Sequence, residues 1–218
     1  MSIDNSPKIR QRAQLERKMN RRASYDRILI ICEGEKTEPL YFEEIKQFRR
    51  LQTANVKVTQ GEYGTSPLQI VKFAEDECLR TKKWEDVYCV FDRDEHQHFN
   101  NALQRVNALN NKYKNEFKQS IKFTAIPSIP CFELWLLLHF ITVAQESHRD
   151  EIVSMLRAPN RIRDYGKGQS GNFTRTKDKL ETAYQNEALL KAQRNRHGNE
   201  NPYTDVGQLV LRLMNLGK

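Results

Sequence analysis

Two short apolar runs stand out in the hydropathy pattern of the chain. One covers residues 27–32 and is rich in isoleucine, the other covers residues 87–91, and charged residues bound both. Because an uninterrupted apolar run is typical of a strand buried on both faces, both segments are predicted to be strands of a parallel sheet. Residues 56–59 alternate in polarity and residues 121–126 are mostly apolar, so they are predicted to add two more strands.

Helical patterns separate these strands. Thr37-Glu38-Pro39 predicts a helix start, with a cap at the first two residues and proline in the first turn. Strands alternating with helices indicate βαβ units. The expected fold class is therefore α/β, with a mostly parallel sheet between helices and a helical C-terminal extension. The other predicted helices cover about 66–82, 99–113, 134–140, 148–157, 173–193 and 204–216, the last with a Thr204-Asp205 cap.

The composition fits one domain of ordinary size in a cytoplasmic protein. The chain has 218 residues, of which 38% are hydrophobic and 29% are charged. No run approaches the roughly 20 apolar residues of a membrane-spanning helix, and the N-terminus lacks the apolar region of a secretory signal. No membrane contact is expected. No C-x-x-C pair occurs, so buried free thiols are expected rather than a zinc site at Cys32, Cys78, Cys89 and Cys131.

The basic excess is concentrated at the two ends of the chain. The net charge is +8 overall, with +5 in residues 1–27 and +3 in residues 145–200, whereas residues 28–144 are near neutral. A near-neutral core flanked by cationic segments suits a nucleic-acid partner, although a solvated basic surface explains the counts nearly as well. We therefore expect a disordered basic arm over 1–26, a core over 27–144 and a basic helical extension over 145–218.

Both apolar runs lead directly into carboxylates. Glu33 follows the first run, and Asp92 and Asp94 follow the second with a spacing of two. Ligands of open parallel sheets bind outside the carboxyl ends of the strands, so these three side chains are expected at one edge. Mg²⁺ suits a few carboxylates together with substrate phosphates, and metal ions of this kind support phosphodiester cleavage. The alternative is that the carboxylates are solvated loop residues or caps of the following helices.

Three segments resemble one protein family. CEGEKTEPLYF, VFDRDEH and PCFELWLLLHF, over about residues 28–140, together resemble the RloB-like family of bacterial proteins, and NPYTDV near the C-terminus also fits. The glutamate after the first strand and the D-x-D after a later one resemble the topoisomerase–primase (Toprim) catalytic domain. The resemblance implies a Toprim-like core and Mg²⁺-dependent cleavage of nucleic acid, as in the overcoming-lysogenization-defect nucleases.

The resemblance also implies a setting and residue roles. RloB-like proteins are encoded beside ABC-type ATPases in abortive-infection modules against phage, where the Toprim protein resembles the toxic effector. Glu33 would be the general base or first metal ligand, and Asp92 and Asp94 would hold Mg²⁺. The related nucleases carry a second acid three residues after the glutamate, where this chain has Lys36. Glu35 and Glu38 are the candidate substitutes, which leaves the number of metals open.

Several weaker signals carry two interpretations each. Glu133 caps an apolar helix or adds a metal ligand, and Lys36 stabilises a pentavalent phosphate or faces solvent. His96 and His98 transfer protons near the scissile phosphate or are polar loop residues. The G-x-G-x-x-G match over 166–171 lacks the preceding buried strand of a dinucleotide site. The alternative is a basic loop that touches phosphates, helped by Arg161, Arg163, Lys167, Arg175, Lys177 and Lys179.

Together these patterns lead to one main hypothesis and one competitor. The main hypothesis is a nuclease that uses Mg²⁺, or Mn²⁺ in its place, and acts on RNA such as tRNA in preference to DNA. Its predicted catalytic set is Glu33, Lys36, Asp92, Asp94 and Glu133, with Glu38 as a further metal ligand. The competitor is a non-catalytic protein that binds nucleic acid or nucleotide and regulates an ABC-type ATPase. Oligomerisation stays open.

Overall fold

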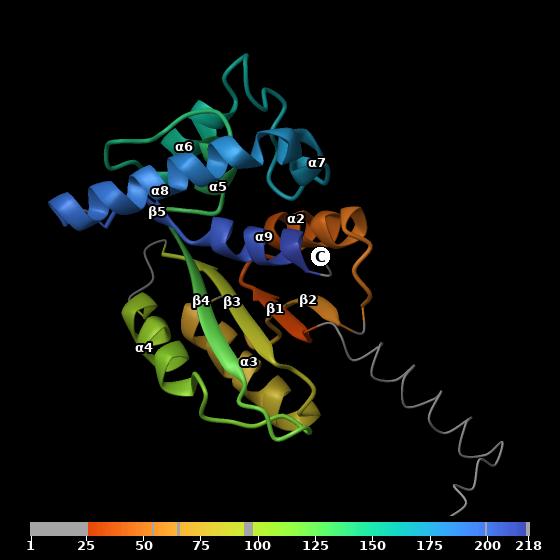
Figure 1. Ribbon diagram of the computed structural model, residues 1–218. Helices are drawn as coiled ribbons and strands as arrows, with labels where there is room; N and C mark the ends of the chain where they lie inside the picture. The colour runs from red at the N-terminus through yellow and green to blue at the C-terminus, as the bar shows by residue number, and fades with distance from the viewer. Residues whose placement is uncertain (1–25, 54, 65, 94–97, 199, 217–218) are drawn as a thin grey trace, which may run out of the picture.

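Strands β1 to β5 form one sheet at the centre of the protein. The computed structural model describes residues 26–53, 55–64, 66–93, 98–198 and 200–216. Within these residues the strand order is β2-β1-β3-β4-β5 (Figure 1). The first four strands run parallel, and β5 pairs antiparallel with β4. The bounds are Ile28–Cys32 for β1, Val56–Gln60 for β2, Asp86–Asp92 for β3, Lys122–Ile129 for β4 and Tyr203–Thr204 for β5.

Strand β1, which lies between β2 and β3, separates two hydrophobic cores. Ile28 and Ile30 face one core, whereas Leu29 and Ile31 face the other, and all four side chains are fully buried. Successive residues of a strand point to opposite faces, so a strand that is covered on both sides needs an apolar residue at every position. This requirement explains the unbroken apolar run that predicted the strand.

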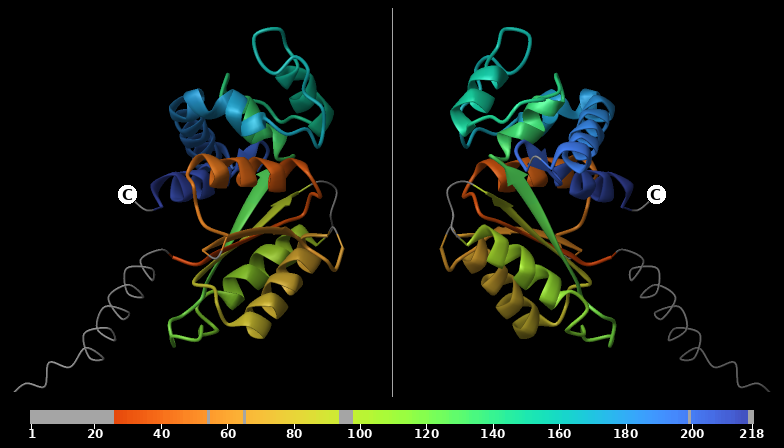
Figure 2. Two further views of the ribbon diagram at one scale, coloured as in Figure 1. Left: turned by 90° about the vertical axis from the view of Figure 1, so that its right-hand side faces the viewer. Right: turned by 90° about the vertical axis from the view of Figure 1, so that its left-hand side faces the viewer.

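Helices cover both faces of the sheet. Helices α3 (Pro67–Thr81) and α4 (Phe99–Leu109) pack on one face, and α2 (Thr37–Phe48), α5 (Glu133–Leu138) and α9 (Val206–Asn215) pack on the other (Figure 2). The segment from α6 to α8 lies beyond α2 and α5 (Figure 1). It comprises α6 (Arg149–Leu156), α7 (Asn172–Thr176), a 3-10 turn (Lys177–Lys179) and α8 (Leu180–His197). The expected α/β class with its mostly parallel sheet is confirmed.

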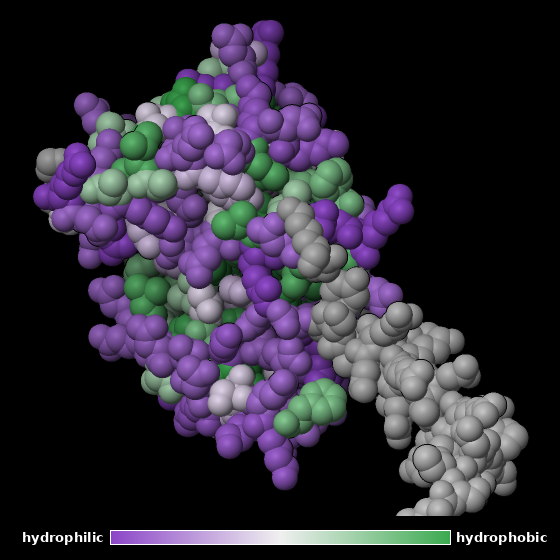
Figure 3. Space-filling view, viewed as in Figure 1, coloured by the Kyte–Doolittle hydropathy of each residue, from purple (hydrophilic) through white to green (hydrophobic). Residues whose placement is uncertain are grey.

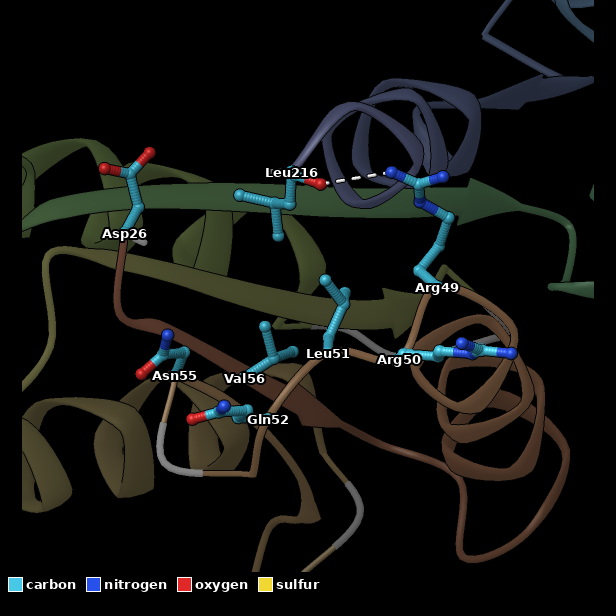
Figure 4. Close-up of a pocket in the computed structure, with 8 residues that line it drawn as sticks. All are labelled: Asp26, Arg49, Arg50, Leu51, Gln52, Asn55, Val56 and Leu216. Atoms are coloured by element: carbon cyan, nitrogen blue, oxygen red, sulfur yellow. Dashed lines mark hydrogen bonds between the residues drawn. The ribbon is translucent and has the colours of Figure 1, made fainter. Parts of the chain in front are cut away.

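The extension shares the hydrophobic core on the α2 face. Ile152 and Leu156 of α6 and Phe173 of α7 belong to the same buried cluster as Ile28 and Ile30 of β1. At the opposite end of the sheet from the carboxyl ends of the strands, Arg49 donates a 3.2 Å hydrogen bond to the Leu216 carbonyl beside a small pocket (Figure 4). This bond ties the end of α2 to the end of α9, where a cation is favourable.

Three predicted helices had wrong boundaries. The one predicted over 173–193 is divided into α7, the 3-10 turn and α8, and α8 continues to His197. The helix predicted over 99–113 ends at Leu109, because the Asn110 side chain turns to accept the Phe123 N–H at 3.2 Å. Thr204 was expected to open a helix but lies in β5, where its hydroxyl is 3.1 Å from that of Ser128. The last helix begins at Val206, whose N–H donates to Thr204 Oγ1 at 3.2 Å.

The cysteine and membrane expectations can also be compared with the structure. All four cysteines are buried free thiols, as expected. None of the described helices combines the length and apolar character needed to cross a membrane. The expected disorder of residues 1–25 falls outside the described residues.

Candidate active site

The candidate site is a cleft at the switch point of the sheet, where the connecting helices change from one face of the sheet to the other. The helix after β1 covers one face of the sheet, whereas the helix after β3 covers the other, and these two strands are neighbours. Open α/β sheets bind ligands outside the carboxyl ends of the strands at such a switch point. Glu33 directly follows β1 and Asp92 is the last residue of β3, so both residues stand at this edge.

A pair of hydrogen bonds fixes Glu33 beside Asp92. The Glu33 N–H donates to the Val90 carbonyl at 2.9 Å and so extends the β1–β3 ladder by one residue. Glu33 Oε2 then accepts the Asp92 N–H, also at 2.9 Å. The structure therefore brings Glu33 and Asp92 together, as the two acidic strand ends predicted. Asp94, His96 and the rest of 94–97 lie outside the described residues.

Glu38 is the second acid that lies among these carboxylates. It sits in the first turn of α2 and is buried. Glu35, in the loop before α2, is exposed and also lines the cleft. A Cβ on Gly34 would overlap the Glu38 carboxylate, so only glycine allows this close approach. Burial raises the pKa of Glu38, and repulsion from Glu133 raises it further.

Glu133 completes a group of four buried carboxylates. It is the first residue of α5, and its Oε1 accepts the Tyr165 hydroxyl at 2.7 Å. Its place in the first turn agrees with the helix-dipole interpretation, and its charge also acts on Asp92 and Glu38. Only 3 to 8% of the surface of each of these four residues is exposed: Glu33, Glu38, Asp92 and Glu133.

Arg149 is a cation in this group that the sequence did not point to. Its Nη2 lies 2.8 Å from Asp92 Oδ2, and Asp92 is almost completely buried. Burial raises the pKa of Asp92 well above its usual range, and the charges of Glu38, Glu133 and Glu33 add to this effect. Arg149 acts in the opposite direction and lowers the Asp92 pKa. One ion pair thus offsets part of the cost of a buried acidic cluster.

The carboxylates open into a cleft of about 450 Å³ with a cationic rim. Lys36 and Lys167 are exposed on this rim, and Arg149 completes it. The Gly168 N–H donates to Thr37 Oγ1 at 3.0 Å, which joins the loop after α6 to the start of α2. The N-terminus of α2 also faces the cleft and favours an anionic ligand. The lining residues are Glu33, Gly34, Glu35, Lys36, Thr37, Glu38, Asp92, Arg149, Lys167 and Gly168.

The six basic residues predicted to bind nucleic acid occupy different environments. Lys167 lines the cleft and Arg163 is exposed. The other four have protein partners: Arg161 donates to the Met155 carbonyl, Arg175 forms two hydrogen bonds with Asp164, Lys177 lies over the Phe48 ring and Lys179 over the Phe140 ring. The structure brings one of the six to the carboxylates. The Gly171 N–H, at the end of the G-x-G-x-x-G match, donates to Glu44 rather than toward the cleft.

The donor chemistry of the cleft fits a hard divalent cation in part. Several carboxylates converge where burial and mutual repulsion raise the pKa values of Asp92 and Glu38, and a cation would relieve both effects. Among the residues that the structure describes, however, no three His, Cys, Asp or Glu side chains are arranged as a ready metal site. The expected ligand Asp94 is outside that set. His98, which is inside it, precedes α4 without capping it through its side chain.

Sequence reasoning missed Arg149, Tyr165 and Thr37 as members of this site. Arg149 lies 57 positions from Asp92, and Tyr165 lies 32 positions from Glu133. No motif marks either residue, because Arg149 reaches the cleft and Tyr165 reaches Glu133 only through the packing of α6 and its following loop on the core. The one available signal was the placement of the basic excess in residues 145–200.

Comparison with known proteins gives one match. A family model described as RloB-like protein matches residues 28–213, which is most of the chain. The match includes both strand-end clusters, the PCFELWLLLHF segment and the α6–α8 region. No curated protein and no solved structure matches the chain.

Proposed function

This chain belongs to the RloB-like protein family, and we propose that it is a divalent-metal-dependent nuclease that acts as the effector of a bacterial anti-phage abortive-infection system. We further propose RNA, including tRNA, as its preferred substrate and an ABC-type ATPase as its partner. One observation carries the proposal. The buried carboxylates Glu33, Glu38 and Asp92 line a cleft with three cations at the switch point of the sheet, and the charge of buried Glu133 acts on two of them.

The two kinds of charge suit the two parts of a phosphodiester reaction. Glu38, Asp92 and Asp94 are the residues that would hold Mg²⁺, with Glu33 beside them. A bound metal of this class lowers the pKa of a water ligand and neutralises charge on the phosphate. The cations on the rim, Lys36 and Lys167, bind the non-bridging oxygens of the nucleic-acid backbone, and α2 adds the positive end of its dipole.

In this proposal Glu33 accepts the proton of the attacking water, and two hydrogen bonds support this role. Its backbone is held in the β1–β3 ladder, and its Oε2 is oriented by the Asp92 N–H. A carboxylate fixed in this way can accept a proton without losing its position during the reaction. Tyr165 similarly orients Glu133 through its hydroxyl.

Cleavage by purified protein tests the proposal. Full-length protein would be incubated with tRNA, plasmid DNA and single-stranded DNA in Mg²⁺ or Mn²⁺, beside Glu33→Gln and Asp92→Asn. Removal of a general base or of a metal ligand should lower the rate by at least about a hundredfold. Asp150→Asn is the matched control, because Asp150 is an exposed acid adjacent to Arg149 that does not line the cleft.

Two results would contradict the nuclease. Equal cleavage by wild type, Glu33→Gln and Asp92→Asn would place the activity elsewhere. If the isolated protein cleaves none of these nucleic acids, it would be co-expressed with the neighbouring ATPase gene and the cells challenged with phage. If wild type and Asp92→Asn then protect cells equally, with no nucleic-acid cleavage, the non-catalytic partner of an ATPase becomes the function.

A further inference from the structure

Arg149 pairs with the same carboxylate that the proposed function assigns to a metal. The Arg149 Nη2 to Asp92 Oδ2 distance is 2.8 Å, and the Arg149 side chain is 33% exposed whereas that of Asp92 is 7% exposed. The guanidinium therefore has one side against the buried cluster and the other toward the open cleft, which it lines.

The backbone that carries Arg149 is held from several directions. His148 and Glu151 form a capping box at the start of α6, in which the His148 N–H donates to Glu151 Oε2 at 2.8 Å. Asn201 donates to the Ser147 carbonyl at 3.0 Å, and Ile152 is fully buried in the core next to β1. A long side chain on a fixed backbone can move its charged end without moving the helix.

The charges around Asp92 determine that a divalent cation would displace the Arg149 guanidinium. Arg149 lowers the pKa of Asp92, and Lys167 together with Arg149 lowers the pKa of Glu38. A cation of charge +2 placed among these carboxylates repels the guanidinium and competes with it for Asp92. Once released, the planar guanidinium matches a phosphate through two parallel hydrogen bonds.

We propose that Arg149 is an exchangeable counter-cation of the cleft, which neutralises Asp92 in the metal-free protein and binds a backbone phosphate of the substrate once a divalent cation is in place. This inference rests on the proposed function and deepens it. The exchange couples metal loading to substrate binding, because the phosphate-binding group becomes available only when the metal has displaced it. Arg149 then acts as a substrate-binding residue rather than as a structural ion pair.

The test measures Mn²⁺ binding and RNA binding separately on the full chain. Mn²⁺ affinity would be measured by isothermal titration calorimetry. Affinity for a labelled single-stranded RNA would be measured by fluorescence anisotropy in Ca²⁺. Arg149→Gln should bind Mn²⁺ about tenfold more tightly, because its competitor at Asp92 is gone, and should bind RNA about tenfold more weakly. Arg149→Lys keeps the charge and should leave Mn²⁺ binding near wild type. It should nevertheless bind RNA more weakly, because lysine lacks the planar fork.

A control variant tests whether the change in Mn²⁺ affinity is specific to Arg149, and two outcomes would contradict the inference. Arg163→Gln removes an exposed arginine outside the cleft and should change Mn²⁺ affinity by less than about twofold. If Arg149→Gln binds Mn²⁺ with wild-type affinity or more weakly, Arg149 does not compete with the metal and the inference fails while the nuclease proposal stands. If neither wild type nor any variant binds Mn²⁺, the metal-dependent nuclease fails together with the exchange.

A thermal measurement covers a variant that folds poorly. Without Arg149 the buried Asp92 charge loses its partner, so metal-free Arg149→Gln should melt at a lower temperature than wild type. Mn²⁺ should reverse this decrease, which gives the variant a larger metal-induced rise in melting temperature than wild type has. An equal or smaller rise overturns the exchange. Arg149→Lys, which retains the charge, supplies the second comparison.

Discussion

Gly34 determines how closely the Glu38 carboxylate can approach the loop after β1. Its Cα is so close to the Glu38 carboxylate that an added Cβ would overlap both oxygens. Its φ lies outside the left-handed region, so an alanine here meets a steric rather than a conformational obstacle. The atoms that must move are the carboxylate at the end of the flexible Glu38 side chain. An alanine at position 34 therefore changes the free energy of unfolding little but displaces Glu38 from the other carboxylates.

We expect Gly34→Ala to separate activity from stability. The free energy of unfolding should change by less than about 1 kcal/mol, because the Glu38 side chain can rotate away. Cleavage should fall by at least about tenfold, because a displaced Glu38 no longer meets Asp92. Urea unfolding and initial cleavage rates measure the two effects.

Gly207 is the matched comparison for this change. A Cβ there would overlap the Glu187 carboxylate and also crowd the Trp135 ring, which is fully buried and cannot move aside. Gly207→Ala should therefore lower the free energy of unfolding by about 1–3 kcal/mol. Wild-type cleavage by Gly34→Ala would argue that Glu38 has no role in the reaction.

At the scale of elements, local pattern predicts what lies within a strand or helix but not what long-range packing adds. Strands β1 and β3 were predictable because double-sided burial forces an apolar residue at every position. Strand β5 was not, because two residues carry no periodicity and its existence depends on pairing with Ser128 and Ile129. Glu33 and Asp92 could be placed at one edge from the strand ends alone, whereas Arg149 required the packing of α6.

Helices α8 and α9 are joined by a buried acid whose charge depends on pH. Glu187 of α8 accepts the Gly207 N–H at 3.2 Å, and Lys191 lies 3.3 Å from Glu187 Oε1 and 2.7 Å from Asp205. Burial raises the pKa of Glu187 to about 7, and Asp205 also raises it, whereas Lys191 lowers it. Lys191 thus only partly offsets the cost of burying this carboxylate.

This linkage predicts a pH-dependent contribution of Glu187 to stability. Because the folded pKa is about 7 and the ordinary value is 4.5, the folded state holds the proton more tightly. The contribution is fully present below pH of about 4.5 and is lost as the pH rises through about 7. Its size is roughly 2–4 kcal/mol, because the folded pKa exceeds 4.5 by about 2.5 and a tenfold difference in proton affinity between the folded and unfolded states corresponds to about 1.4 kcal/mol.

Urea unfolding of wild type and Glu187→Gln from pH 4.5 to 8 measures this effect. The difference between the two proteins isolates Glu187 from the other titrating groups. Glutamine stays neutral at every pH, so the variant should gain stability relative to wild type as the pH rises across this range. Glu181→Gln, an exposed acid at the start of the same helix, should give a constant difference. A constant difference for Glu187→Gln as well would mean that its folded pKa is not raised.

At the scale of the whole molecule, the basic N-terminal segment is separate in sequence from the residues of the cleft, whose carboxylates Glu33, Glu38 and Asp92 are buried. The face in Figure 3 is mostly hydrophilic, with hydrophobic residues in small patches. Residues 1–25 contain seven Lys and Arg against two Asp and Glu, a net charge of +5. Charge of this density in a segment with few apolar residues suits non-specific attraction to a phosphate backbone more than packing against the core.

Removal of residues 1–25 tests whether the charge of this segment contributes to RNA binding. Asp26 and Arg27 would remain, and with them the ion pairs to Arg212, Glu85 and Glu116 that hold the start of β1. The truncated protein should keep its melting temperature but bind RNA more weakly in low salt. A plot of log K against log salt concentration should become shallower by about 0.7 for each phosphate of the single strand that the segment neutralises, and by at most about 5 if all seven cations take part. Fluorescence anisotropy at several KCl concentrations gives both slopes. Because the cleft cations stay in place, the two proteins should converge in affinity at high salt. Parallel lines separated by a constant offset would show that the segment acts through something other than its charge.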